Sequence, residues 1–249
     1  MSYISGEHLV KQYATGEAAV LAVKDISFEI EAGEFVAVMG ESGSGKSTLL
    51  SIVGVLNTPT SGRLVVGGSD VYRLGQEEQA DFRKASLGFV FQSFHLIPYL
   101  TLAENVMLPL ATMKAKTKKK LAIAEDALAR VGLLGKAGRL PNQISGGEQE
   151  RVAIARAIVN HPPILLADEP TGNLDSKTGA DIMKLLTQLN GDGTTVVMVT
   201  HSVEYARHAE RILLLSDGQL VQETRPEKGL GSRGTGQGSC EGRLNTFGM

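Results

Sequence analysis

Three short runs of the chain are apolar at every position rather than at alternate positions. They cover Phe35–Met39, residues 164–167 and Thr195–Val199. Unbroken apolar runs are typical of strands in parallel sheets, where both faces of the sheet are covered. Each run is followed by a turn and a helix-like stretch. The pattern therefore predicts an α/β fold whose functional residues lie just beyond the strand ends.

Other parts of the chain have different patterns. Residues 19–31 alternate between polar and apolar positions, and residues 62–67 form a further strand-like run. We therefore expect an antiparallel β-subdomain beside the mainly parallel core sheet. Residues 100–140 instead carry apolar side chains at helical spacing, which predicts an inserted helical subdomain. We expect the basic run at 114–120 to form the solvated start of its main helix.

The composition limits the compartment and the partners. The chain is 42% hydrophobic and 21% charged, with a formal net charge of −2. Nucleic-acid binding would show as a basic excess, which is missing. No apolar run approaches the roughly 20 residues that span a bilayer, and the single cysteine, Cys240, favours a reducing compartment. We expect a cytosolic chain that binds no nucleic acid and reaches a membrane only through a partner.

A phosphate-binding loop follows the first apolar run. The pattern Gly-x-x-x-x-Gly-Lys-Ser/Thr is met at residues 40–47, and a helix-compatible run follows at 47–56. In such a loop, backbone N–H groups and the helix N-terminus face one phosphate. Lys46 is expected to bridge the β- and γ-phosphates, and the Ser47 hydroxyl to bind Mg²⁺. The expected phosphate-binding residues are Gly40, Glu41, Ser42, Gly43, Ser44, Gly45, Lys46, Ser47 and Thr48.

An acidic pair ends the second apolar run. Asp168 follows residues 164–167 directly, so the strand would carry it to the phosphate-binding loop, where it can hold Mg²⁺ through water. Glu169 lies one residue further along and can act as the base that polarises an attacking water. An exposed acidic turn is the alternative for an isolated Asp-Glu, but the loop upstream favours the catalytic interpretation.

A second small-residue turn opens a helix in the middle of the chain. Ser145, Gly146 and Gly147 precede an apolar helical pattern, and a helix N-terminus with a hydroxyl is a second anion site. Two phosphate-binding elements so far apart in one chain suggest that two copies share nucleotide head to tail. Residues 144–157 resemble the ABC-ATPase signature, and in that family the signature of one subunit closes on the ATP held by the other.

The resemblance to the ABC ATPases covers about residues 3–223 and implies four further roles. Gln92 is similar to the glutamine that contacts Mg²⁺ and water and senses the transmembrane partner. Asp175 resembles the acidic residue of the loop that crosses the dimer interface. His201 resembles the switch histidine that contacts the γ-phosphate. Tyr13 resembles the aromatic residue that stacks on adenine.

Three segments resemble one subfamily in particular, the ATPases of lipoprotein release and macrolide export. They are residues 88–92, 101–106 and 167–176. This resemblance implies a homodimer that hydrolyses ATP and powers a membrane permease. It would act at the cytoplasmic face of the inner membrane, in export or extraction of a lipoprotein, lipid, peptide or drug-like substrate.

The same resemblance implies a division of the chain. We expect an ATP-binding domain over residues 3–225, with a helical and signature subdomain at about 92–160. The Gly-rich tail at 226–249 is expected to be disordered. The alternative function is that of a soluble ABC ATPase outside transport, such as a cluster-assembly factor. A GTPase is disfavoured because the chain has no Asn-Lys-x-Asp guanine-binding motif.

Overall fold

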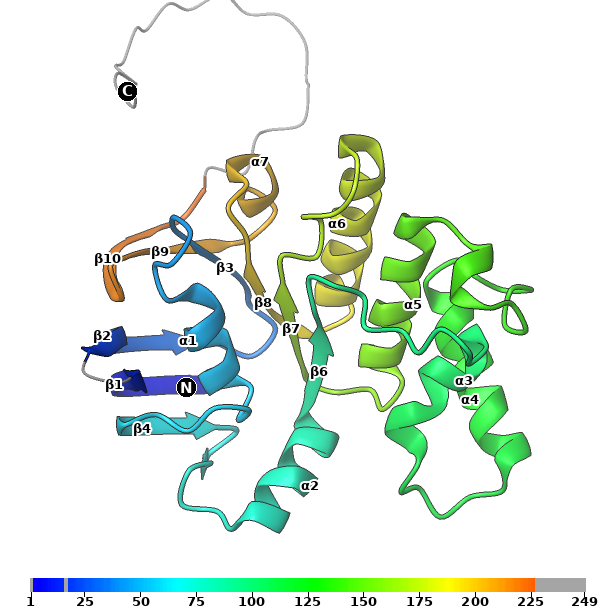
Figure 1. Ribbon diagram of the computed structural model, residues 1–249, viewed down its shortest axis with the longest axis horizontal. Helices are drawn as coiled ribbons and strands as arrows, with labels where there is room; N and C mark the ends of the chain where they lie inside the picture. The colour runs from blue at the N-terminus through cyan, green and yellow to red at the C-terminus, as the bar shows by residue number, and fades with distance from the viewer. Residues whose placement is uncertain (1, 16–17, 227–249) are drawn as a thin grey trace, which may run out of the picture.

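A six-stranded, mainly parallel sheet forms the centre of the molecule (Figure 1). The computed structural model describes residues 2–15 and 18–226. The spatial order of the sheet is β10-β9-β3-β8-β7-β6, and within it only the β9–β10 pairing is antiparallel. Its strands are β3 (Phe35–Met39), β6 (Leu87–Val90), β7 (Ile164–Asp168), β8 (Thr195–Val199), β9 (Arg211–Ser216) and β10 (Gln219–Thr224). The predicted α/β fold is confirmed.

The central strands bury both of their faces, which explains their unbroken apolar sequences. In β3, Val36 and Val38 pack into one hydrophobic core, while Phe35 and Ala37 pack into the other. Strands β7 and β8 divide their side chains between the same two cores in the same alternating way. Each face is thus closed by other elements, as parallel sheets require.

The predicted antiparallel β-subdomain is a second sheet, in the order β2-β1-β4-β5. Its strands are β1 (Ile4–Thr15), β2 (Ala18–Ile30), β4 (Ser61–Val66) and β5 (Ser69–Asp70). The alternating apolar residues of β2 are buried against α1 (Lys46–Val53), within the core that also receives Val36 and Val38. Helix α1 thus lies between the two sheets, with its N-terminus at the end of β3.

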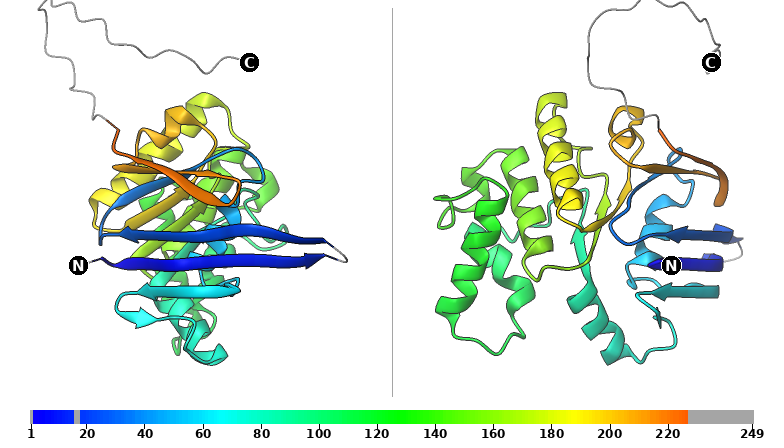
Figure 2. Two further views of the ribbon diagram at one scale, coloured as in Figure 1. Left: turned by 90° about the vertical axis from the view of Figure 1, so that its left-hand side faces the viewer. Right: turned by 180° about the vertical axis from the view of Figure 1, so that it is seen from behind.

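The helical subdomain enters the chain between β6 and β7, as predicted. Its elements are α3 (Leu102–Met107), η1 (Leu108–Leu110), α4 (Thr117–Arg130), η2 (Pro141–Gln143) and α5 (Gly146–Ile158). In the right-hand view of Figure 2 these green helices lie at the opposite end of the molecule from the blue N-terminal strands. Helices α6 (Ser176–Gly191) and α7 (Val203–Ala206) complete the same side of the central sheet. None of the helices in the described ranges is long and apolar enough to cross a membrane.

Two helix boundaries differ from expectation. Helix α1 ends at Val53 rather than near residue 56, because Gly54 is its C-cap and Val55 adopts the left-handed backbone conformation, with φ of 54°. Helix α4 begins at Thr117, so the first part of the basic run precedes the helix. Helix α2 (Gln76–Ser86) was not predicted; it has no buried residues and therefore no apolar pattern. The Gly-rich tail lies outside the described residues from 227 onward.

Candidate nucleotide site

The phosphate-binding loop turns between β3 and α1 on glycines in unusual backbone conformations. Gly40, Gly43 and Gly45 have φ angles of 152°, 81° and 97°. A Cβ atom on Gly40 would lie 2.2 Å from the carbonyl oxygen of Leu215, and one on Gly45 would lie 2.3 Å from that of Ala22. Only glycine fits here, and the result is a bare backbone turn leading into a helix N-terminus, an arrangement suited to phosphate.

The first two side chains of α1 connect the loop with the end of β7. Lys46 folds back over the loop, and its Nζ donates to the carbonyl oxygens of Gly40 at 2.8 Å and Glu41 at 2.7 Å. The Ser47 hydroxyl donates to Oδ1 of Asp168 at 3.1 Å. The structure therefore brings the predicted Ser47 and Asp168 into direct contact across 121 residues of sequence.

The acidic pair sits where β7 ends, in two different environments. Burial raises the pKa of Asp168, and the hydrogen bond from Ser47 partly opposes this. Glu169 adopts the left-handed backbone conformation with φ of 48°, and its N–H donates to the carbonyl oxygen of Val199 at 3.0 Å. Such a conformation strains a residue other than glycine and often marks a functional position. Oε2 of Glu169 lies 2.9 Å from Nδ1 of His201, although the contact lacks hydrogen-bond alignment.

A cavity of about 390 Å³ joins the phosphate-binding loop with Glu169 and His201, while Asp168 does not line it. Its size lies in the range of small-molecule sites. It carries the Lys46 ammonium, loop N–H groups and hydroxyls on one side, and Gln92, Glu169 and His201 on the other. Its lining residues are Ala22, Ser42, Gly43, Gly45, Lys46, Ser47, Thr48, Gln92, Glu169 and His201. Ala22 was not predicted, because it comes from the separate antiparallel sheet.

The segment that carries Gln92 is held by contacts that the sequence did not indicate. Nδ2 of Asn173 donates to the carbonyl oxygen of Gln92 at 2.8 Å. Arg156, near the end of α5, donates to the carbonyl oxygens of Phe94 at 2.8 Å and His95 at 2.6 Å. These partners come from elements at least 61 residues away in the chain. No local pattern could have revealed them.

Tyr13 does not line this cavity. It lies on β1 with 37% of its surface exposed, and Nδ2 of Asn57 donates a hydrogen bond to its hydroxyl. Nζ of Lys11 lies 5.1 Å from the centre of its ring. The ring is therefore partly free, and stacking on adenine stays a prediction.

The residues at 145–147 and Asp175 also lie away from the cavity, each at the start of a helix. Ser145 is the N-cap of α5, and its hydroxyl accepts the N–H of Glu148 at 3.3 Å. Asp175 is the N-cap of α6, and its bonds from Thr178 lower the pKa of its carboxyl. Figure 1 shows α1 and α5 on opposite sides of β7. One chain thus presents two separate helix N-termini suited to phosphate.

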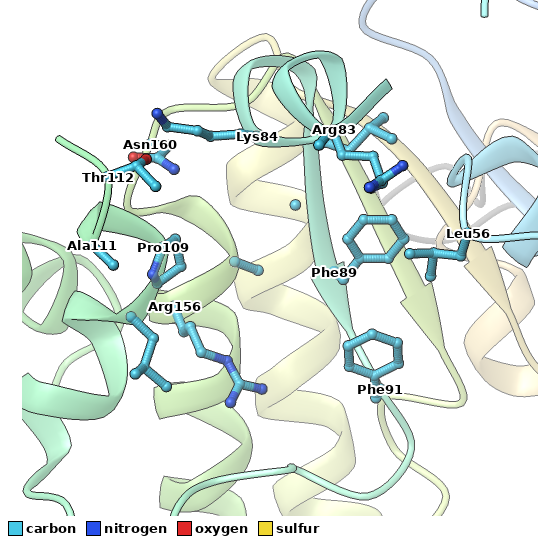
Figure 3. Close-up of a pocket in the computed structure, with 15 residues that line it drawn as sticks. Leu56, Arg83, Lys84, Phe89, Phe91, Pro109, Ala111, Thr112, Arg156 and Asn160 are labelled. Carbon is cyan, nitrogen blue, oxygen red and sulfur yellow. The ribbon is translucent and has the colours of Figure 1, made fainter. Parts of the chain in front are cut away.

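A second hollow, of about 440 Å³, lies between the core and the helical subdomain. Figure 3 shows Phe89 and Phe91 on one wall, Pro109 and Ala111 across from them, and Arg156 between. The two phenyl rings are stacked, with centroids 5.8 Å apart. The fifteen lining residues include three cations and no acid. They are Leu56, Ala80, Arg83, Lys84, Leu87, Gly88, Phe89, Phe91, Leu108, Pro109, Ala111, Thr112, Arg156, Ala157 and Asn160.

Comparison with known proteins identifies the family of the chain. A family model described as ABC transporter matches residues 23–172. The chain belongs to this family. It is an ATP-binding and ATP-hydrolysing cassette, which confirms the expected enzyme class.

The individual relatives are whole cassettes or longer proteins that contain one. The uncharacterized ABC transporter ATP-binding protein MJ0796 of Methanocaldococcus jannaschii is 47% identical over 226 residues, which is 88% of this chain and 95% of the relative. The macrolide export ATP-binding/permease protein MacB of Burkholderia pseudomallei is 46% identical over 213 residues, 86% of this chain. This ABC cassette covers only 33% of that relative.

A solved structure supports the same assignment. It is the dimeric structure of a post-hydrolysis state of the ATP-binding cassette MJ0796 bound to ADP and Pi. It matches this ABC cassette with a TM-score of 0.83 and 45% identity, over 90% of this chain and 99% of that one.

Proposed function

We propose that the chain hydrolyses ATP as one subunit of an ABC transporter and powers a partner permease in export or extraction. The observation that carries this proposal is the single cavity that gathers Lys46, Gln92, Glu169 and His201 around the phosphate-binding loop. The relatives named as macrolide exporters favour transport over the role of a soluble cluster-assembly factor.

The residues around Ser47 fit a magnesium ion that arrives with the nucleotide. A serine hydroxyl and a carboxylate 3.1 Å apart are oxygen ligands of the kind Mg²⁺ prefers. Among the residues that the structure describes, no cluster of three His, Cys, Asp or Glu side chains is present. In this proposal phosphate oxygens complete the site. Ser47, Asp168 and Gln92 would hold the ion. When bound, Mg²⁺ neutralises charge on the phosphates.

Hydrolysis needs a base beside the γ-phosphate, and we assign that role to Glu169. Its backbone lies at the strand end, and its side chain, 12% exposed, lines the cavity. Its buried Oε2 has no aligned hydrogen bond among the described residues, so the carboxylate keeps the capacity to accept one from the attacking water. His201, beside it, would contact the γ-phosphate. Lys46 and the loop N–H groups would stabilise the charge that develops there.

A second copy of the chain completes the site in this proposal. Residues 145–147 lie outside the cavity of their own chain, yet form a helix N-terminus with a hydroxyl. A head-to-tail homodimer would bring this element of one subunit onto the phosphates held by the other, and Asp175 to the interface. The dimeric solved relative supports this arrangement.

We place the permease contact at the hollow lined by Phe89, Phe91 and Arg156. An apolar groove with a cationic rim suits an amphipathic segment that carries acidic residues. Arg156 belongs to this groove and also binds the carbonyl oxygens after Gln92, so an occupant would act on the nucleotide site. Through the permease, the subunit would sit at the cytoplasmic face of the inner membrane.

Replacing Glu169 by glutamine tests the proposal. Glu169→Gln should keep ATP binding, lower turnover by about a hundredfold or more, and accumulate an ATP-bound dimer. Nucleotide binding, phosphate release and sedimentation measure the three effects. Glu204→Gln, an exposed acid in α7, is the matched control and should change none of them. Full turnover by Glu169→Gln would overturn the assignment of the base.

A further inference from the structure

The signature helix α5 begins with a carboxylate bound to its capping serine. Oε2 of Glu148 accepts the N–H of Ser145 at 3.0 Å and its hydroxyl at 3.3 Å. Ser145 accepts in return from the N–H of Glu148. The hydroxyl that would meet a phosphate is therefore oriented by an acid.

This acid has a counter-ion from a different segment. Lys136, in the loop between α4 and η2, forms an ion pair with Oε1 of Glu148. The two side chains are 33% and 26% exposed, so both lie partly out of water. The hydrogen bond from Lys136 is the main cause that lowers the pKa of Glu148, and the Ser145 N–H adds to it. The carboxylate thus stays charged near neutral pH.

A charged carboxylate is a poor neighbour for a triphosphate, because like charges repel at short range. On Ser145 it would weaken the positive end of the helix where phosphate must bind. The positive charge of Lys136 offsets this repulsion, while the Glu148 carboxylate stays hydrogen-bonded to Ser145.

We propose that Lys136 is a positioning residue of the shared phosphate site. Its ammonium neutralises Glu148 and keeps that carboxylate on Ser145, so that α5 can present its N-terminus to the nucleotide of a second copy. This inference rests on the head-to-tail dimer of the proposed function. A simple surface ion pair would instead contribute little to stability and nothing to the dimer.

The test measures the ATP-dependent dimer in a Glu169→Gln parent, by sedimentation over a range of protein concentrations with Mg-ATP. Lys136→Gln should raise the dimer dissociation constant about tenfold or more, because two sites per dimer each lose a counter-ion. The double variant Lys136→Gln/Glu148→Gln should return to within about threefold of the parent. The defect of the single variant should shrink at high salt.

A matched control separates charge from position. Lys184→Gln removes a lysine from an exposed pair with Asp181 on α6 and should leave the dimer unchanged. Thermal unfolding and ATP binding to the monomer should be the same for Lys136→Gln and the parent.

Each outcome decides a separate point. A parent that remains monomeric with ATP overturns the proposed dimer and this inference with it. A parent that dimerises while Lys136→Gln dimerises equally well overturns the inference alone, as does a double variant no better than the single one. If Lys136→Gln does not fold, Glu148→Gln in the parent decides: the dimer should be at least as tight, and a weaker one overturns the inference.

Discussion

Glu150 is a buried acid in the middle of α5, and replacing it should change how stability depends on pH. Its side chain is 1% exposed, and its Oε1 has no hydrogen-bond partner among the described residues. Burial raises its pKa from 4.5 to about 8, and the charge of Arg156 only partly opposes this. Glu150→Gln replaces the acid with a neutral group of nearly the same shape.

The sign and size follow from the two protonation states. Below pH 4.5 the carboxyl is neutral in the folded and the unfolded chain alike. Between 4.5 and about 8 the unfolded chain loses this proton while the folded chain keeps it, so folding stability is lost as the pH rises. Each pH unit in that window is worth about 1.4 kcal/mol, which amounts to about 5 kcal/mol as an upper limit. Local relaxation of the protein and entry of water reduce this penalty, and we expect a loss of stability of about 2–5 kcal/mol.

Urea unfolding of the nucleotide-free protein measures this difference. The free energies of unfolding of wild type and Glu150→Gln should be similar at about pH 5, and the variant should be more stable by about 2–5 kcal/mol at about pH 8. Glu125→Gln, an exposed acid on α4, should show no such gap. A difference between wild type and Glu150→Gln that does not change with pH would refute the reasoning.

Two further predictions test packing and partner binding. Gly88→Ala should lower the free energy of unfolding by about 1–3 kcal/mol in urea titrations. The new Cβ would lie 2.4 Å from the carbonyl oxygen of Ala157, a backbone atom that cannot rotate away as a side chain can. The control is Gly138→Ala, whose Cβ would have no other atom within 4 Å, so its free energy of unfolding should be nearly unchanged. Leu108→Asp puts an acid into the groove and should reduce co-sedimentation with membrane vesicles of the native cells at least about tenfold. Leu134→Asp changes an exposed leucine outside the groove and should not reduce this co-sedimentation. An equal loss of co-sedimentation in both variants would count against the groove as the permease contact.

The central sheet could be predicted because its physical cause is local. Strands buried on both faces need an apolar residue at every position, and β3, β7 and β8 have them. The loop at 40–48 was recognisable because phosphate binding requires glycine at fixed spacings. The contact of Ser47 with Asp168 followed, because β3 and β7 run parallel on either side of β8 and end at the same edge of the sheet.

The elements that were missed lack such a local cause. The pairing of β1 with β2 has register shifts between Gly6 and Gln12, so apolar and polar residues do not alternate regularly along the strand. Helix α2 has no fully buried residue and packs only the partly buried Phe82 on the core, which is too little to give an apolar pattern at helical spacing. Strand β6, in which Gly88 and Phe89 interrupt the aliphatic run, gave only a subfamily resemblance. The contacts of Arg156 and Lys136 depend on tertiary packing, which no spacing in the sequence reports.

Helix α5 connects the functional regions of the molecule. It begins at Ser145, carries Glu150 at its buried centre, and near its end Arg156 reaches both the groove and the backbone after Gln92. Its buried face packs against α3, α4, α6 and β6, so the helix can move only together with its surroundings. Arg156 is also the charge that opposes the raised pKa of Glu150. An occupant that draws Arg156 toward the groove would therefore make the ionisation of Glu150 more costly, and the effect would fall on the same helix that begins at Ser145.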